Sequence, residues 1–261
     1  MAITGIGRVI FWTGGSLWMG QAIAPIELHS HHAIQACIGL PDQIQLRTGD
    51  TIPWASYSCA VVPPNLPHAF QAPGKMVANI FCEPESSLGR GLLRRFGRER
   101  IMGVSALEIA RPARTLRLAF DDGHSDDDLE DAALDILYSL SGSVPARPVD
   151  RRINLTIAFI SANLTESLSL LTVASHVELS SGRFRHLFVE ETGISFRSYL
   201  LWTRLNRALE LGFGGASWTD AAHAANFADS AHLSRSARRM YGIAPSSIRQ
   251  TISLAVRPMI A

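Results

Sequence analysis

One spacing recurs in the second half of the chain and restricts the folds that this half can adopt. Three pairs of residues, one member in each of two copies, are separated by 48 or 49 positions: Ala174 and Ala222, Phe184 and Leu233, and Gly193 and Gly242. Each copy has the pattern of a short helix, a tight break and a second helix that ends at a glycine. The repeat therefore predicts two similar helical units in tandem.

The first copy begins where Ser169 can cap a short helix, and Ser180 can cap the next helix after a break of about three residues. Phe184, Leu187 and Phe188 then fall at positions i, i+3 and i+4, which places them on one face of the second helix. Two short helices joined by so tight a turn are typical of a helix-turn-helix unit.

The second copy follows the same plan and is joined to the first by a longer helix. Ser217 can cap its short helix, and Asp229 and Ser230 can cap its second helix. We predict the connecting helix from Ser195 to about residue 211, with residues 212–215 ending it. About 17 residues give a length of about 25 Å. That length would hold the two second helices about one DNA turn, or about 34 Å, apart.

The second helix of such a unit enters the major groove of DNA with the face opposite its buried stripe. The candidate DNA-binding residues on these faces are Ser181, Gly182, Arg183, Arg185 and His186 in the first copy, and Ser230, Ala231, His232, Arg235 and Arg238 in the second. Gly182 and Ala231 offer no side-chain hydrogen bond, so readout near them would rest on their neighbours or on DNA shape. We expect the first copy to dominate base readout and the second to anchor the DNA backbone.

The charge of the chain is unevenly divided. Residues 1–149 hold 12 basic and 15 acidic side chains, whereas residues 150–261 hold 12 arginines and 8 acidic side chains. A positive second half fits binding to a polyanion. Arg185 and Arg235 are candidates for bidentate contacts with guanine, with phosphate contact or a solvated position as the alternative for each.

The first half is predicted to be β-rich and then helical. Short apolar runs between Gly7 and about Glu85 are separated by turn-forming pairs, which favours a sandwich or small barrel. Helices are expected at about 88–100 and around 132–140. The apolar face of the latter is either a dimer surface or the face that packs on its own barrel; its residues are Leu134, Ile136, Leu137 and Leu140.

A cluster of glycine, serine and proline at residues 141–148 is typical of an interdomain linker. The sequence therefore predicts three segments. Residues 1–142 would form an effector-binding or dimerisation domain with C-terminal helices, residues 143–149 the linker, and residues 150–252 the DNA-binding domain.

Several function classes find no support in the sequence. No run approaches the roughly 20 apolar residues that span a membrane, and the N-terminus lacks the pattern of a signal peptide. The three cysteines are odd in number and form no CxxC pair, which favours reduced thiols in a cytoplasmic protein. No nucleophile elbow, P-loop or dinucleotide fingerprint is present, so we expect neither an enzyme nor a bound cofactor.

At this level of detail the second half resembles the AraC/XylS-type transcriptional regulators. The resemblance covers about residues 150–250 and lies in these stretches: Leu170-x-x-Val173-Ala174, Ser180-x-x-x-Phe184-x-x-Leu187-Phe188, Gly193-Ile194-Ser195-Phe196, Tyr199-Leu200-x-x-x-Arg204-Leu205-x-x-Ala208, Asn226-Phe227-x-Asp229-x-x-His232-Leu233-Ser234-Arg235 and Gly242-Ile243-Ala244-Pro245-Ser246-x-x-Arg249. It implies two helix-turn-helix subdomains joined by a linking helix, with the groove-facing residues reading DNA.

Three positions differ from what this resemblance leads us to expect. Glu178 occupies the first turn in place of glycine, and Asn226 occupies the second, although asparagine tolerates a left-handed conformation. Ala237 stands in the last recognition helix where the family usually has an aromatic residue. The second subdomain would be looser unless Met240 or Trp218 fills that space.

Members of this family often carry an N-terminal cupin-like β-barrel that binds a small effector, and residues 8–85 resemble such a barrel. The resemblance lies in His29-Ser30-His31-His32 and in Pro63-Pro64-x-x-Pro67-His68-x-Phe70. It implies an α+β chain, with the barrel followed by the all-α DNA-binding domain. The candidate effector pocket is formed by His29, His31, Trp54, His68 and Phe70.

The same histidines also permit a metal interpretation. His29 and His31 would point to one side of a strand, with His68 as a third ligand and Gln35 or Glu27 as a fourth. Cupin enzymes have a carboxylate where this chain has Gln35, so we favour pocket or structural histidines and expect no metal.

We therefore expect a sequence-specific regulator of transcription, an activator or a repressor, controlled by a small-molecule effector in its N-terminal domain. Its expected partners are double-stranded DNA, a second copy of the chain in a homodimer and, for an activator, RNA polymerase. The alternative is a metal-dependent cupin enzyme with a helical appendage, or a regulator that acts through dimerisation without a ligand.

Overall fold

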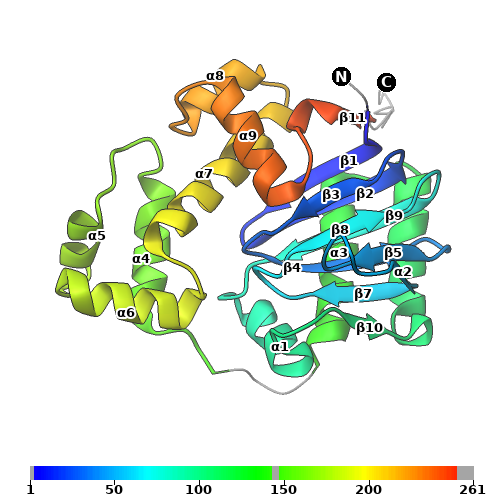
Figure 1. The fold of residues 1–261 in the computed structure, drawn as a ribbon, viewed down its shortest axis with the longest axis horizontal. Coiled ribbons are helices and arrows are strands. Elements are labelled where there is room, and N and C mark those ends of the chain that lie inside the picture. Colours follow the sequence, from blue (N-terminus) through cyan, green and yellow to red (C-terminus); the bar gives the residue numbers. More distant parts are fainter. Residues whose placement is uncertain (1–2, 143–146, 252–261) are drawn as a thin grey trace, which may run out of the picture.

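The computed structural model describes residues 3–142 and 147–251. The β-rich part comes first and the helical part second, so the chain has a mixed α+β architecture (Figure 1). Much of the predicted linker, residues 143–146, lies outside the described residues. No helix among the described residues is long and apolar enough to cross a membrane.

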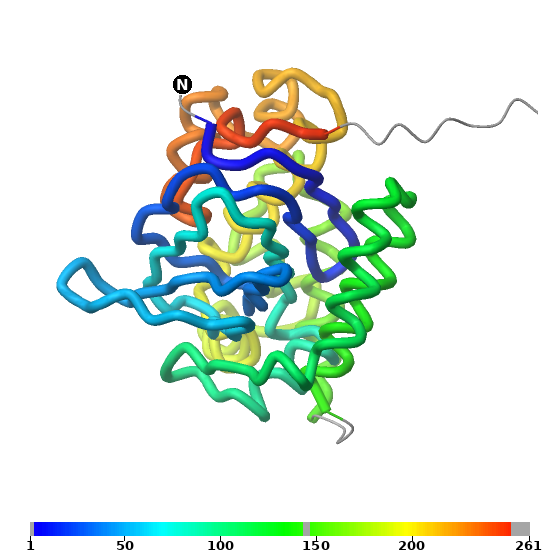
Figure 2. Tube along the Cα trace, turned by 90° about the vertical axis from the view of Figure 1, so that its right-hand side faces the viewer, coloured from blue at the N-terminus to red at the C-terminus, as the bar shows by residue number. Residues whose placement is uncertain are grey.

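The β half consists of two sheets. The seven-stranded sheet has the order β10-β7-β4-β9-β2-β1-β11, and the four-stranded sheet has the order β3-β8-β5-β6. The strands are β1 (Gly5–Trp12), β2 (Gly15–Ala22), β3 (Ile26–His29), β4 (Ile34–Gly39), β5 (Ile44–Arg47), β6 (Ala55–Tyr57), β7 (Cys59–Val62), β8 (His68–Gln71), β9 (Met76–Cys82), β10 (Met102–Val104) and β11 (Ile248–Gln250). The predicted turn pairs lie between strands, and the β5–β6 hairpin extends away from the rest of the sheet (Figure 2).

Three helices, α1 (Ser87–Phe96), α2 (Ala106–Asp121) and α3 (Asp126–Ser141), pack with the seven-stranded sheet around one apolar core. The helix expected to reach residue 100 ends at Phe96, and the sequence did not predict α2 or β10. On α3, Ile136, Leu137 and Leu140 are buried in this core. Of the two alternatives for this apolar face, packing on its own β half is therefore the one that the structure shows.

The helical half contains α4 (Arg151–Ala162), α5 (Leu170–His176), α6 (Ser181–Thr192), α7 (Phe196–Phe213), α8 (Trp218–Ala224) and α9 (Ser230–Tyr241), followed by a short 3-10 turn. The predicted helix starts at Ser169, Ser180, Ser195 and Ser217 are N-caps that accept backbone hydrogen bonds, and Asp150 caps α4 in the same way. Asp229 alone caps α9, because Ser230 is already helical. This half therefore consists of two helix pairs, α5–α6 and α8–α9, joined by α7.

The connecting helix α7 runs two residues further than expected and does not end at Gly212. A Cβ atom on Gly212 would lie 2.1 Å from the Trp218 ring. The glycine thus lets the helix continue beneath this indole, and Gly214 forms the C-cap instead.

The end of the helical half returns to the β half. Strand β11 forms the edge of the seven-stranded sheet and pairs in parallel with β1, and the backbone N–H of Thr4 donates to the carbonyl of Ser247 at 2.9 Å. The first and last described strands therefore lie side by side (Figure 1). The second helix pair is consequently held at both ends, by α7 and by the sheet.

Candidate nucleic-acid interface and buried histidine cluster

Helix α6 presents most of the residues predicted for the first DNA-reading face. Gly182, Arg183, Arg185 and His186 are exposed and Ser181 is half-buried, while Phe184 and Phe188 on the opposite face are fully buried. Gly193 ends the helix in the left-handed conformation with φ of 80°. The predicted division of this helix into a core face and an exposed face is thus present.

Helix α9 presents the second set in the same way. Ala231, Arg235 and Arg238 are exposed, and Ser230 and His232 are half-buried. The His232 ring meets the Phe227 ring edge-on at 5.0 Å. Arg239, which is not among the predicted residues, is exposed next to Arg238 and one turn beyond Arg235. Its position at i+4 from Arg235 was the signal that could have identified it.

Both turns between the paired helices contain a residue in the left-handed region, Glu178 with φ of 55° and Asn226 with φ of 59°. The Asn226 side chain also has a bonding role. Its amide donates to the carbonyls of Thr165 and Glu166, at 3.1 and 3.2 Å. Asparagine therefore maintains the turn and ties the second pair to the loop before the first.

The second pair does not have a core of its own. Ala237 lies in a cluster with Trp202, Phe227 and Tyr241 that also includes Phe81 of the β half. Trp18 of β2 stacks on Tyr241 with ring centroids 4.8 Å apart. Met240 and Trp218 pack against the same cluster, as anticipated. Aromatic residues of the β half thus complete the core in which Ala237 replaces the family's aromatic residue.

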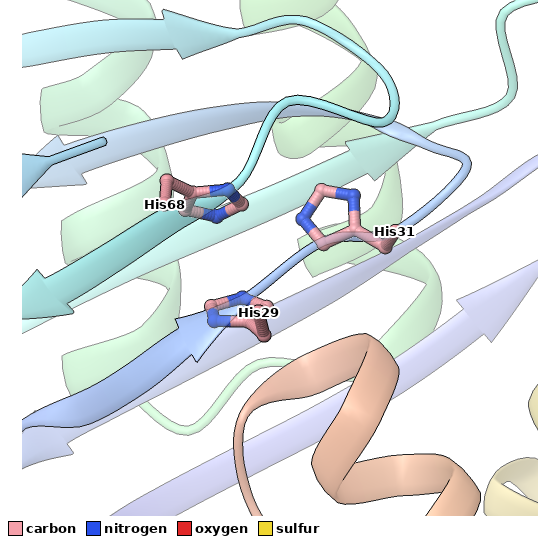
Figure 3. A group of neighbouring side chains, drawn as sticks. All are labelled: His29, His31 and His68. Atoms are coloured by element: carbon pink, nitrogen blue, oxygen red, sulfur yellow. The ribbon is translucent and has the colours of Figure 1, made fainter. Parts of the chain in front are cut away.

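The β half also brings together the three predicted histidines (Figure 3). His29 ends β3 and pairs in register with His68 at the start of β8. The prediction that His29 and His31 share a strand is wrong, because β3 ends at His29 and His31 lies in the following connection. The rings still converge, and one nitrogen of each lies within 4.8 Å of those of the other two.

Backbone carbonyls fix the orientation of the three rings. The Nδ1 atoms lie 2.7 Å from the oxygen of Glu27 for His29, 2.9 Å from that of Ala33 for His31, and 2.9 Å from that of Leu66 for His68. A carbonyl only accepts, so each Nδ1 carries the hydrogen and each Nε2 carries a lone pair. Burial lowers the pKa of His29 to about 4 and of His31 to about 3, and it lowers the pKa of His68 well below its usual value. All three are therefore neutral at pH 7.

Gln35 of β4 lies between two of these rings. Its side-chain amide is 3.0 Å from Nε2 of His31 and 2.9 Å from Nε2 of His68, and it also contacts Asn79 at 3.0 Å. Because both Nε2 atoms accept, the amide satisfies the rings when its NH₂ group faces them and its oxygen accepts from an Asn79 amide that is turned in the same way. Nε2 of His29 has no hydrogen-bond partner in the described part of the chain.

The other predicted pocket residues lie elsewhere. Phe70 is buried between the two sheets, two positions along β8 from His68. Trp54 precedes β6 at the opposite edge of the four-stranded sheet, where the Arg47 guanidinium lies 4.7 Å from its ring centroid. Glu27 is exposed and contributes only its carbonyl. The structure thus groups the histidines with Gln35 and places Trp54 apart from them.

Where the β half meets α7, the structure shows a buried polar group that the sequence analysis missed. Nε2 of His32 lies 2.9 Å from the Glu85 carboxylate, and the His32 ring meets the Tyr199 ring edge-on at 5.4 Å. Burial and the neighbouring Glu85 raise the pKa of Glu83 to about 8. A cavity of about 570 Å³ opens beside Glu83 and Tyr199 and reaches Asn206 of α7.

Comparison with known proteins identifies the helical half. Residues 173–251 match the helix-turn-helix domain family. The uncharacterized HTH-type transcriptional regulator YidL of Escherichia coli is 34% identical over 102 residues, which are 39% of this chain and 34% of that protein. Regulatory protein PocR of Salmonella typhimurium is 32% identical over 108 residues, which are 41% of this chain and 35% of that protein. Residues 173–251 therefore form a helix-turn-helix domain similar to the domains of these regulatory proteins. The match spans about a third of the length of these curated relatives.

The fold as a whole resembles that of ToxT from Vibrio cholerae O395. The two agree with a TM-score of 0.58 at 10% identity, over 89% of this chain and 95% of ToxT. A second ToxT structure, with an unsaturated fatty acid bound, agrees with a TM-score of 0.56 over 89% of this chain and 92% of its own, also at 10% identity. At such low identity the likeness shows the arrangement alone, a sheet-containing half followed by a helical half.

Proposed function

We propose that the protein is a sequence-specific transcriptional regulator that reads double-stranded DNA through two helix-turn-helix units, α5–α6 and α8–α9. The observation that carries the proposal is the exposure of arginines on both second helices, Arg183 and Arg185 on α6 and Arg235 and Arg238 on α9, within an AraC-type domain. Exposed guanidinium groups on a recognition helix are suited to the phosphates and guanine edges of the major groove.

In this proposal residues 1–142 form a cupin-like domain that binds a small-molecule effector, residues 143–149 link, and residues 150–252 bind DNA. The cavity between the two halves supports an effector, because β1, β2 and α7 all contribute to its lining. A molecule placed there would contact both halves at once. The fatty acid in the related ToxT fold further supports a small-molecule effector.

We propose a regulator rather than a metal-dependent cupin enzyme. Its matched relatives are regulatory proteins. We further propose a cytoplasmic homodimer that would contact RNA polymerase if it activates transcription. With the inner face of α3 covered, the dimer surface would be the outer face of α2 and α3, where Leu107, Leu118 and Tyr138 are exposed by 88%, 49% and 61%.

The test is selection of bound fragments from genomic DNA, followed by alanine substitution. Arg185→Ala or Arg235→Ala should weaken binding to the selected site by about 1–3 kcal/mol and relax the preference at one base pair. Arg100→Ala, an exposed arginine after α1 and outside both helix pairs and the proposed dimer surface, is the control and should leave binding unchanged. An equal loss of affinity on all DNA sequences would reject base readout by the substituted arginine.

The two units should contribute unequally. We expect substitutions of Arg183, Arg185 and His186 to alter sequence preference more than substitutions on α9. A footprint with equal protection over two adjacent major grooves, and equal mutational cost in both, would overturn this order.

A further inference from the structure

We propose that His29, His31 and His68 bind one divalent transition-metal ion, and that this ion is an effector acting on α9. The proposal rests on the proposed function, since the ion would control the DNA binding proposed there. It would be a second effector, distinct from a small molecule in the cavity beside Glu83 and Tyr199. It revises the expectation drawn from the sequence, where Gln35 in place of a carboxylate argued against a metal.

The orientation of the rings is the first argument. All three Nδ1–H groups are held by backbone carbonyls, so each Nε2 carries a lone pair, and the three rings converge with one nitrogen of each within 4.8 Å of those of the other two (Figure 3). Packing alone does not require this convergence. Histidines that ligate a metal almost always donate their other N–H to such an acceptor, which fixes the tautomer.

The free nitrogen is the second argument. The Gln35 amide can satisfy Nε2 of His31 and of His68, whereas Nε2 of His29 has no partner among the described residues and is not fully buried, so an ion can reach it. An ion at the centre of the cluster would satisfy all three nitrogens at once.

The donor set selects the class of ion. Three neutral imidazoles and a carboxamide oxygen suit Zn²⁺ and its neighbours Fe²⁺, Co²⁺ and Ni²⁺, whereas Mg²⁺ and Ca²⁺ prefer carboxylate and other oxygen ligands. Zn–N bonds of about 2.0–2.1 Å in a tetrahedron separate the nitrogens by about 3.3 Å. The nitrogens now lie within 4.8 Å of one another, so small side-chain movements would close the site. Turning the Gln35 amide would supply the fourth ligand, an oxygen.

The link to DNA binding runs through the end of α9. Gly242 caps this helix with φ of 73°, and a Cβ atom there would lie 2.8 Å from Nδ1 of His29 and 2.9 Å from the Glu27 carbonyl. The neighbouring Tyr241 ring is 6.1 Å from the His31 ring. The end of α9 thus packs directly against β3 at the cluster. Coordination of one ion by the three histidines should therefore fix β3 relative to β8 and shift the end of α9.

The experiment uses the full chain stripped with a chelator and titrated with Zn²⁺, with Mg²⁺ as the control ion. We expect one Zn²⁺ per chain by calorimetry, slower amide exchange at residues 240–243, and a change of about five-fold or more in affinity for the selected DNA site. Failure to bind one Zn²⁺ overturns the proposal. Zn²⁺ binding that leaves both exchange and DNA affinity unchanged overturns the effector role. A chain that binds Zn²⁺ but no DNA at all refutes the proposed function, because metal binding is measured without DNA.

Variants locate the ion. His29→Asn and His68→Asn should abolish stoichiometric Zn²⁺ binding, whereas His124→Asn should not, since His124 is half-exposed near the start of α3. Binding that persists in the two cluster variants places the ion elsewhere and overturns the assignment. If neither variant folds, X-ray absorption of the Zn²⁺-loaded natural chain decides. Three imidazole ligands support the site, and fewer than two overturn it.

Discussion

The two helix pairs share one plan but differ in what holds them. The first pair has a core of its own, in which Phe184 and Phe188 pack with Tyr199 of α7. Its contact with the β half is polar, because Arg90 of α1 pairs with the buried Glu191 at the end of α6. The second pair shares its core with the β half. Among the described residues, apolar side chains of the β half therefore pack against α9, whereas α6 meets the β half through the Arg90–Glu191 ion pair.

The two capping glycines show the difference most clearly. Gly193 and Gly242 end corresponding helices at nearly the same φ, 80° and 73°. A Cβ on Gly193 would meet only the end of the Arg98 side chain at 3.3 Å, whereas a Cβ on Gly242 would meet Ile26 at 2.4 Å and the Glu27 backbone at 2.9 Å. Gly193 is thus required for its left-handed conformation alone, whereas Gly242 is required for that conformation and for the close approach of β3.

The largest expected effect on stability comes from adding a Cβ atom at Gly242. Gly242→Ala should lower the free energy of unfolding by about 2–5 kcal/mol, since a left-handed alanine costs about 1–2 kcal/mol and overpacking against β3 adds about 1–3 kcal/mol. Gly193→Ala is the matched control and should cost only the conformational term. Denaturant unfolding measures both, and equal costs would show that α9 is not pressed against β3.

The second effect concerns the aromatic contacts between the β half and the second helix pair. Trp18 lies against Tyr241 and also meets Phe213 of α7 at 5.7 Å. Because Trp18 is only partly buried, Trp18→Ala should cost about 2–3 kcal/mol, less than a fully buried tryptophan.

Hydrogen exchange should reveal where that cost falls. In Trp18→Ala we expect faster amide exchange in α9 and unchanged exchange in α6, whereas Trp54→Ala, on the distant hairpin, should affect neither. Equal acceleration of α6 and α9 would mean that the two pairs respond as one body, contrary to the comparison.

Much of this arrangement could be predicted from the sequence, and the rest could not for definite reasons. The caps and the 49-residue repeat are local signals, so Ser180, Ser217 and both glycines were placed correctly. The docking of α9 depends on contacts between residues such as Trp18 and Tyr241 that are more than 200 positions apart, and no local pattern reports these. The histidines were found from their spacing, but the carbonyl partners that set their tautomers required the structure.

The free energy of unfolding should also depend on pH through Glu83, which lies where the β half meets α7. The raised pKa of Glu83, about 8, exceeds its unfolded value of about 4.3, so this group's contribution to stability is complete below pH 4.3 and is lost as the pH rises to about 8. Glu83→Gln removes this loss, and the variant should gain at least about 1 kcal/mol relative to the natural chain between pH 4.5 and pH 8. Urea unfolding across this range measures the gain. Glu99→Gln, an exposed control, should follow the natural chain, and a parallel profile for Glu83→Gln would contradict the prediction.

The smallest effect separates the two turns. Glu178→Gly relieves a left-handed glutamate but increases the entropy of the unfolded chain, so stability should stay within about 1 kcal/mol of the natural value and should not fall. Asn226→Gly relieves less strain, because asparagine tolerates this conformation, and removes two hydrogen bonds to the loop at Thr165 and Glu166. It should cost about 1 kcal/mol. Opposite signs in thermal unfolding would show that the second turn, unlike the first, fastens the two units together, and a stabilising Asn226→Gly would refute that role.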